Sequence, residues 1–119
     1  MEDVYELYRR GMGLLQDGHF HQATVPLAKA RDLEPEKTSI REALGRAYFR
    51  SHHFEEARAE FEAVVERSPT NDYALYCLGR ALMQLGRPAE ARKPLVLASS
   101  LRPERRDYRI YRDRARAAA

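Results

Sequence analysis

The sequence predicts an all-α protein built from stacked pairs of antiparallel helices. Prolines recur every 34 residues, and small residues keep the same register: Pro35, Pro69 and Pro103; Gly11, Gly45 and Gly79; Ala23, Ala57 and Ala91. A 34-residue period is long enough for two helices and a turn, and too short for a closed domain. Each unit is therefore expected to bury its apolar face against a neighbouring unit.

The first helix of each unit carries a stripe of apolar and small residues. In the middle unit the stripe is Leu44, Gly45 and Tyr48, and its equivalents are Leu7, Gly11 and Leu14, and Leu75, Leu78, Gly79 and Leu82. Glycine within a helix costs about 1 kcal/mol of helix propensity. It also removes the β-carbon where two helices cross, so the pattern predicts close helix contacts at the three glycines.

Turn and capping residues mark where the predicted helices begin and end. Gly18 and Gly86 fall between the paired helices, where a positive φ angle is often needed. His52 takes this position in the middle unit, so its turn is expected to be less relaxed. Thr70, Asn71 and Asp72 offer caps for the first helix of the third unit. Pro35, Pro69 and Pro103 end the second helices.

Two further prolines, Pro26 and Pro94, lie at equivalent points near the start of the second helices of the first and third units. A proline beyond the first turn of a helix removes a hydrogen bond. Because the apolar pattern continues through both sites, a gentle bend is predicted at each.

Residues 106–119 are predicted to form a last helix that covers the end of the stack. Tyr108, Tyr111, Ala115 and Ala118 share one face of this helix. Strict 34-residue register would instead bury Arg109, Arg112 and Arg116. The sequence therefore predicts that the helix is rotated, or that the turn before it is shortened.

Taken together, these motifs resemble those of the tetratricopeptide repeat family over residues 4–105. The middle copy shows them as Leu44, Gly45, Tyr48, Phe54, Ala57, Phe61 and Pro69, while the first large residue is Leu7, Arg41 or Leu75 and never Trp. The resemblance implies an all-α, right-handed superhelix of antiparallel helix pairs. It also implies a single domain over 1–119, with repeats at 4–37, 38–71 and 72–105 and a capping helix at 106–119.

Composition favours a small cytoplasmic protein of one domain. The 119 residues are 44% hydrophobic and 33% charged, and nothing approaches the roughly 18 consecutive apolar residues of a membrane helix. The start Met1-Glu2-Asp3 does not suit a secretory signal, and the one cysteine, Cys77, fits a reducing compartment. Arginine far exceeds lysine, which hints at a bacterial, GC-rich genome.

The charge is concentrated in the C-terminal segment. The net charge of +3 combines a nearly neutral repeat body with a basic segment after Leu101. A neutral body argues against a long nucleic-acid track, which requires cations along one face. Binding of RNA or another acidic surface through the last helix is the less favoured alternative to a solubilising cap; it would use Arg105, Arg106, Arg109, Arg112, Arg114 and Arg116.

A second stripe on the first helices supplies candidate partner-binding residues. By analogy with the family, this stripe lines a concave groove that holds extended or helical peptides, and aromatic, Met and Arg side chains are enriched at such interfaces. The alternative is that some of them pack neighbouring first helices together. The candidate contact residues are Tyr5, Tyr8, Met12, Arg46, Phe49, Tyr73, Tyr76, Arg80 and Met83.

The groove is predicted to prefer a protein or peptide with apolar or aromatic anchors. The family's best-understood ligand is the acidic tail of a chaperone, clamped by Lys, Asn and Arg. At the corresponding positions this chain has Tyr8, Met12, Ala43, Tyr73 and Cys77, so the clamp is absent. Arg46 and Arg80 could still pair with a carboxylate. The chain is expected to be a monomer or a weak homo-oligomer.

Catalysis and metal binding have little support in the sequence. No phosphate-binding loop, nucleophile elbow or acid–base pair is present, so no enzymatic activity and no cofactor are expected. His19, His21, His52 and His53 fall in neighbouring turns and could approach one another, but exposed turn residues explain them better. Cys77 reads as an inert packing thiol. The predicted function is that of a non-catalytic scaffold or adaptor.

Overall fold

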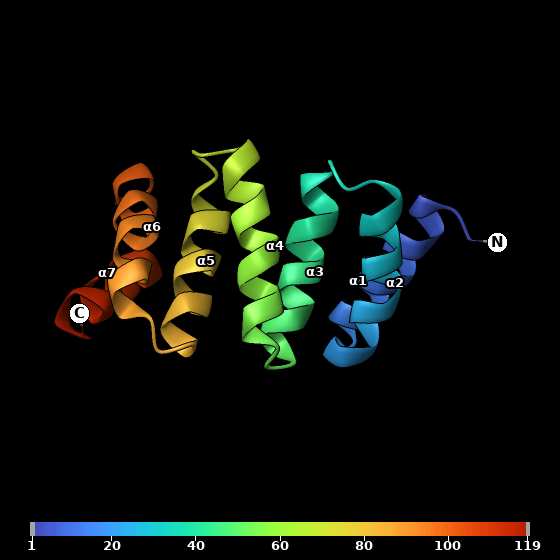
Figure 1. Ribbon diagram of the computed structural model, residues 1–119, viewed down its shortest axis with the longest axis horizontal. Helices are drawn as coiled ribbons and strands as arrows, with labels where there is room; N and C mark the ends of the chain where they lie inside the picture. Colours follow the sequence, from blue (N-terminus) through green and yellow to red (C-terminus); the bar gives the residue numbers. More distant parts are fainter. Residues whose placement is uncertain (1, 119) are drawn as a thin grey trace. The chain divides into compact units, whose positions relative to one another are not determined.

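A computed structural model describes residues 2–118, which form seven α-helices and no strand (Figure 1). The odd-numbered helices begin at Val4, Thr38, Asp72 and Arg106, so each starts one repeat period after the one before. The chain divides into two compact units, residues 1–60 and 61–119, which are described in turn. The helices are α1 Val4–Gln16, α2 Phe20–Leu33, α3 Thr38–Arg50, α4 Phe54–Arg67, α5 Asp72–Gln84, α6 Pro88–Leu101 and α7 Arg106–Ala118.

Two first helices begin with side-chain caps. Asp3 Oδ1 accepts a hydrogen bond from the backbone N–H of Glu6 at 2.8 Å, at the start of α1. Asn71 Oδ1 accepts one from the backbone N–H of Ala74 at 3.1 Å, so Asn71 is the cap among the three residues predicted for this role. Each cap satisfies a backbone donor that has no partner within the helix.

The turn between paired helices has the same geometry in all three repeats. Gly18 and Gly86 have φ angles of 82° and 71°, and His52 has a φ of 65°, as predicted from their shared register. In each repeat the residue after this position donates a backbone hydrogen bond to the carbonyl five residues earlier; for His53 and Tyr48 the distance is 2.8 Å. Because a β-carbon is disfavoured at positive φ, the middle turn is strained.

Replacing His52 with glycine is expected to stabilise the protein by up to about 1 kcal/mol, because the left-handed conformation then costs no steric strain. Thermal unfolding followed by circular dichroism measures the change. The reciprocal change Gly18→Ala should lower the melting temperature, since an added β-carbon there meets no neighbouring atom and only the positive φ opposes it. A lower melting temperature for His52→Gly would contradict the strain argument.

In the first unit, α1 and α2 cross closely at Gly11. A β-carbon at Gly11 would lie 2.4 Å from Cγ of Leu27, which is fully buried. The close crossing predicted for Gly11 is therefore confirmed. The same core is continued by Leu15 of α1 and by Leu44 and Ala47 of α3.

A buried carboxylate holds two arginines in the same unit. Glu60 is only 5% exposed, and it accepts hydrogen bonds from Arg41 at 2.9 Å and from Arg31 at 2.6 Å. Burial lowers the pKa of Arg31, but the hydrogen bond and charge of Glu60 outweigh it, so the pKa is raised overall. Glu60 stands at the register position that is Pro26 in the first repeat, and Arg41 at the position of Leu7. The middle repeat thus replaces two apolar residues with an ion pair.

Pro26 and Pro94 lie inside α2 and α6, beyond the first turn, and both are buried. Both helices nevertheless continue to Leu33 and Leu101. The expected loss of one backbone hydrogen bond at each site therefore does not end either helix. The bend at each site stays a prediction.

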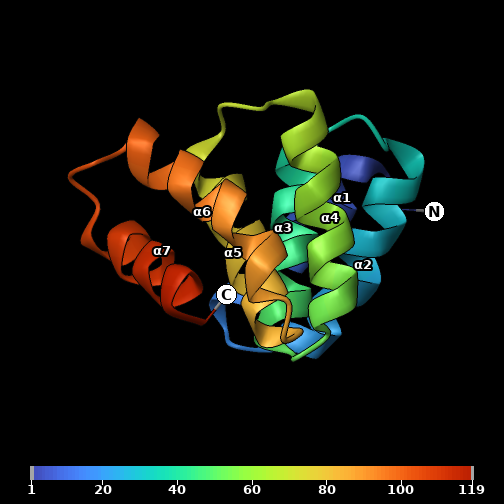
Figure 2. The ribbon, with the colours of Figure 1, turned by 60° about the vertical axis from the view of Figure 1, so that its left-hand side comes forward.

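In the second unit, α5 and α6 repeat the close crossing, and α7 packs against both (Figure 2). A β-carbon at Gly79 would lie 2.3 Å from Cγ of the buried Leu95. Tyr108 of α7 is fully buried, and its hydroxyl donates a hydrogen bond to Asp72 Oδ2 at 2.7 Å. The last helix is therefore part of the core of this unit.

The register predicted for the last helix was wrong. α7 begins one full repeat period after α5, so the turn is not shortened, and the buried residues Tyr108 and Ala115 stand at the positions of the buried Ala74 and Ala81, so the helix is not rotated. Arg109, Arg112 and Arg116 stand where α5 has Leu75, Leu78 and Leu82. In α5 these positions are buried, whereas those of α7 stay at least partly exposed, because no further helix follows within residues 2–118.

Burial, together with the hydrogen bond to the charged Asp72, raises the pKa of Tyr108. As the pH rises above 10, the ordinary pKa of tyrosine, the Tyr108 hydroxyl ionises in the unfolded chain before it ionises in the folded protein. The free energy of unfolding should therefore fall above pH 10. Urea unfolding between pH 8 and pH 11 measures this fall. Tyr108→Phe cannot ionise and should show a smaller fall. An equal slope in both proteins would mean that Tyr108 does not contribute to alkaline unfolding.

Candidate functional site

In the first unit, the candidate contact residues differ strongly in exposure. Tyr5 is 66% exposed, and the guanidinium of Arg9 lies 5.6 Å from its ring centroid. Tyr8 and Met12 are half-buried and pack against the core of this unit. Tyr5 is thus more accessible to a partner than Tyr8 and Met12.

Arg46 and Phe49 lie one turn apart on α3. Arg46 is exposed, while Phe49 is half-buried and meets the ring of Phe54 edge to face, with centroids 5.2 Å apart. The ring of Phe49 is therefore held in one orientation. Packing within the unit thus positions the Phe49 ring before any partner binds.

In the second unit, Tyr73 and Tyr76 have separate roles. Tyr73 is 37% exposed on α5, but Tyr76 is only 7% exposed. Tyr76 packs on Tyr108 with ring centroids 4.6 Å apart and meets Tyr111 edge to face at 5.6 Å. Burial raises the pKa of its hydroxyl. Tyr76 thus packs α5 against the capping helix α7, a packing role like the alternative given for this stripe, and Met83 is half-buried.

Two residues of α7, Tyr111 and Arg114, were not among the candidate contact residues. The ring of Tyr111 lies against the guanidinium of Arg80, 4.7 Å from centroid to guanidinium carbon, and against that of Arg114, at 4.8 Å. Arg114 follows Arg80 by one repeat period, as Arg80 follows Arg46. This spacing could have added Arg114 to the candidate contact residues. The sequence analysis instead grouped Arg114 with the other arginines of the last helix.

Most of the C-terminal arginines are engaged within the helix or its turn. Arg105 pairs with Asp107 at 2.8 Å, and its hydrogen bond lowers the pKa of that carboxyl. Arg112 and Arg116 both pair with Asp113. Arg109 donates a hydrogen bond to the carbonyl of Pro103, just as Arg41 does to that of Pro35. Four of the C-terminal arginines are therefore engaged by groups of α7 or of the turn before it.

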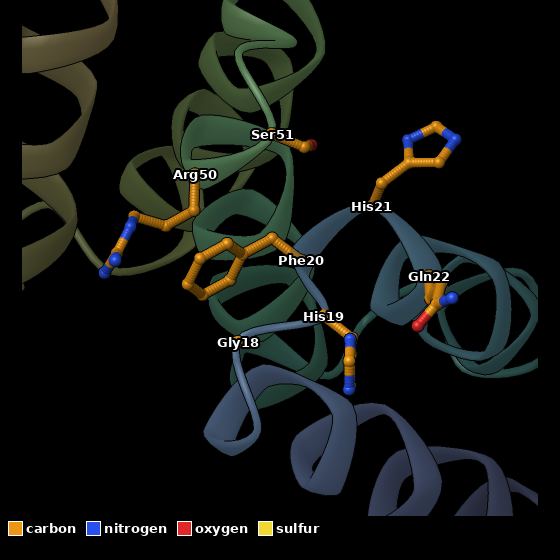
Figure 3. Close-up of a pocket in the computed structure, with 7 residues that line it drawn as sticks. All are labelled: Gly18, His19, Phe20, His21, Gln22, Arg50 and Ser51. Carbon is orange, nitrogen blue, oxygen red and sulfur yellow. The ribbon is translucent and has the colours of Figure 1, made fainter.

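A shallow pocket of about 480 Å³ lies at the turns of the first unit (Figure 3). Arg50 stacks over the ring of Phe20 with its guanidinium carbon 4.3 Å from the centroid, while His21 extends in a different direction. The polar side chains therefore do not converge on one point. The pocket is lined by Gly18, His19, Phe20, His21, Gln22, Arg50 and Ser51.

Two of the four turn histidines lie close to each other. The rings of His21 and His53 stack with centroids 5.4 Å apart, and His53 Nδ1 lies 3.6 Å from Glu56 Oε2. Within residues 2–118 no three His, Cys, Asp or Glu side chains are grouped closely enough to hold a metal ion. In the same residues, no helix combines the length and apolar character needed to cross a bilayer.

Sequence comparison identifies the repeat. Two sequence profiles described as Tetratricopeptide repeat match residues 42–105 and 14–67, so the first alone covers more than half of the chain. No curated protein sequence matches the chain.

Solved structures of repeat proteins have the same fold. The first such domain of Spaghetti (RPAP3), bound to the HSP90 peptide SRMEEVD, superposes with a TM-score of 0.89 at 21% identity, over 98% of this chain and 92% of that one. A double mutant of MamA gives 0.92 at 23% identity, over 97% and 65%. The OM64 domain of Arabidopsis gives 0.88 at 18% identity, over 96% and 94%. The all-α solenoid fold and the capping helix are thereby confirmed.

Proposed function

Because the chain belongs to the tetratricopeptide repeat family, whose members are protein-interaction modules, we propose that it binds a peptide or helix of a partner protein through exposed residues of its first helices. The observation that carries the proposal is the exposure of Tyr5 and Tyr73, which occupy the same register position on α1 and α5. Large exposed aromatic rings are frequent anchors in protein interfaces.

Two further observations support a binding role. Tyr8, Met12 and Met83 are half-buried, so each presents a pre-positioned apolar edge. Such residues lose little conformational freedom when a partner binds. The arrangement favours a partner with apolar or aromatic side chains, and it requires no cofactor. The RPAP3 domain, which has the same fold, was solved with a bound peptide. We place this activity in the cytoplasm, in line with the one reduced cysteine, Cys77.

Selection of displayed random peptides on the immobilised protein tests the proposal. Selected peptides should bind the protein in solution, as measured by fluorescence anisotropy. Tyr5→Ala and Tyr73→Ala should each weaken that binding by about tenfold or more, because loss of a central aromatic anchor commonly costs about 2 kcal/mol or more. The melting temperature of both variants should change little, since both rings are exposed.

Val25→Ala is the matched control, because Val25 is 55% exposed on the second helix α2. It should leave the affinity for the selected peptides unchanged. If no peptide is enriched, or if both tyrosine variants bind as tightly as the original protein, the partner does not bind at the first helices. The C-terminal arginines would then be the better candidate, with RNA as the alternative ligand.

A further inference from the structure

Two exposed arginines lie one turn apart on α3. Arg46 and Arg50 are four residues apart, so their side chains are neighbours on the helix surface. Like charges at this spacing repel each other and weaken a helix slightly. An anion that binds beside them relieves this repulsion. The two residues form the α3 arginine pair, a positive surface of the first unit.

In the part of the chain that the structure describes, no acidic side chain neutralises the α3 arginine pair. Arg31 and Arg41 of the same unit share the carboxylate of Glu60, whereas neither member of the pair forms an ion pair within residues 2–118. Glu42 lies one turn before Arg46, yet no ion pair joins these two side chains. Both positive charges are therefore available to a ligand that approaches α3.

An aromatic ring restrains Arg50. The guanidinium carbon of Arg50 lies 4.3 Å from the ring centroid of Phe20, and Phe20 packs against the core cluster that contains Leu27 and Leu44. Contact with the ring limits the orientations of the guanidinium group, while its N–H donors can still form paired hydrogen bonds with a carboxylate. Arg50 therefore loses less conformational freedom on binding an anion than an unrestrained arginine would.

The contact between Phe20 and Arg50 forms part of the wall of the shallow pocket at the turns of the first unit (Figure 3). None of the described residues that line this pocket is acidic, so a carboxylate that enters meets no negative charge from its walls. Because the polar side chains of the pocket point in different directions, they do not surround a small molecule. The pocket instead suits one side chain of a longer ligand that also contacts α3.

We propose that Arg50 binds an aspartate or glutamate side chain of the partner peptide at this pocket, and that Arg46 adds attraction for the same acidic segment. The choice of ligand follows from charge complementarity, since two exposed cations without an acidic partner attract an anion. This inference rests on the proposed function, because it assigns an acidic residue to the peptide bound at the first helices. It adds Arg50, which the candidate contact residues do not include.

A double-mutant cycle with a selected peptide tests the proposal. Displayed peptides are selected in parallel on the original protein, on Arg50→Gln and on Lys29→Gln. The last is a matched control, because it removes one positive charge from an exposed residue of α2 that does not line the pocket. Selected peptides are synthesised with an amidated C-terminus, so that only side chains supply carboxylates.

The acidic residue of a selected peptide is then replaced by glutamine, and fluorescence anisotropy measures the dissociation constants of both peptides for the original protein and for Arg50→Gln. Melting temperatures show that each variant is folded. Peptides selected on the original protein and on Lys29→Gln should be enriched in Asp and Glu, and those selected on Arg50→Gln should be less enriched.

Arg50→Gln should weaken binding of the acidic peptide by about fivefold, as expected for an ion pair that stays in contact with water. It should hardly change binding of the glutamine peptide. Lys29→Gln should change neither affinity. The loss caused by Arg50→Gln should also shrink as the salt concentration is raised from about 50 to about 500 mM.

Equal loss for the acidic and glutamine peptides, or selected peptides with no excess of acid, would overturn the anion site and leave the peptide-binding function intact. Failure to select any peptide would overturn both proposals. Tighter binding of a short oligouridylate than of the acidic peptide, lost in Arg50→Gln, would assign the α3 arginine pair to nucleic acid and overturn the anion site.

Discussion

Glu60→Ala is expected to destabilise the protein by about 3 kcal/mol, the largest single effect that the structure predicts. Glu60 is 5% exposed and accepts hydrogen bonds from both Arg31 and Arg41. Its removal leaves two partly buried guanidinium groups without their shared carboxylate. Loss of one partner from a buried ion pair commonly costs about 3–5 kcal/mol, and the lower end applies here because both arginines keep some contact with water.

Glu62→Ala is the control for this change, because Glu62 lies two residues after Glu60 in α4 and is exposed. Both substitutions place alanine in the same helix interior, so helix propensity cancels between them. The control should cost less than about 1 kcal/mol, since interactions of an exposed carboxylate contribute little. Urea unfolding of the two variants measures the difference in the free energy of unfolding. Equal stability would show that the ion pair contributes nothing beyond what water supplies to the separated charges.

Gly79→Ala is expected to destabilise the protein by about 1–3 kcal/mol, although alanine is the better helix former. The added β-carbon would lie 2.3 Å from Cγ and 2.6 Å from Cδ2 of Leu95. Leu95 is fully buried, so its side chain cannot move aside without disturbing the packing of α5 on α6. Gly11→Ala should behave alike, since its β-carbon meets Leu27 in the same way.

Gly13→Ala separates crowding from helix propensity. Gly13 lies in α1 two residues after Gly11, and a β-carbon there meets no atom within 4 Å. This variant should gain up to about 1 kcal/mol of stability, because alanine replaces glycine in a helix interior. Thermal unfolding of the three variants provides the comparison. A stabilised Gly79→Ala would show that the two helices separate at little cost.

The glycine effects could be predicted from the sequence because the 34-residue repeat places each glycine at the same point of the same helix pair. The repeat also identified the turns, since Gly18, His52 and Gly86 occupy the same position in their repeats and each has a positive φ. Local patterns of this kind depend on a few neighbouring residues. The family resemblance rests on the same patterns, and the sequence profiles confirm it.

The sequence by itself thus determined the all-α repeat fold, the close crossings and the class of interaction module, because these depend on periodic spacing along each helix. Only the tertiary structure decided which stripe residues are exposed. Tyr73 and Tyr76 look alike in sequence, yet Tyr76 is buried because Tyr108 and Tyr111 pack on it from α7. The placement of Arg80 and Arg114 on one ring likewise depends on how two helices meet, and spacing within either helix contains no information about the other.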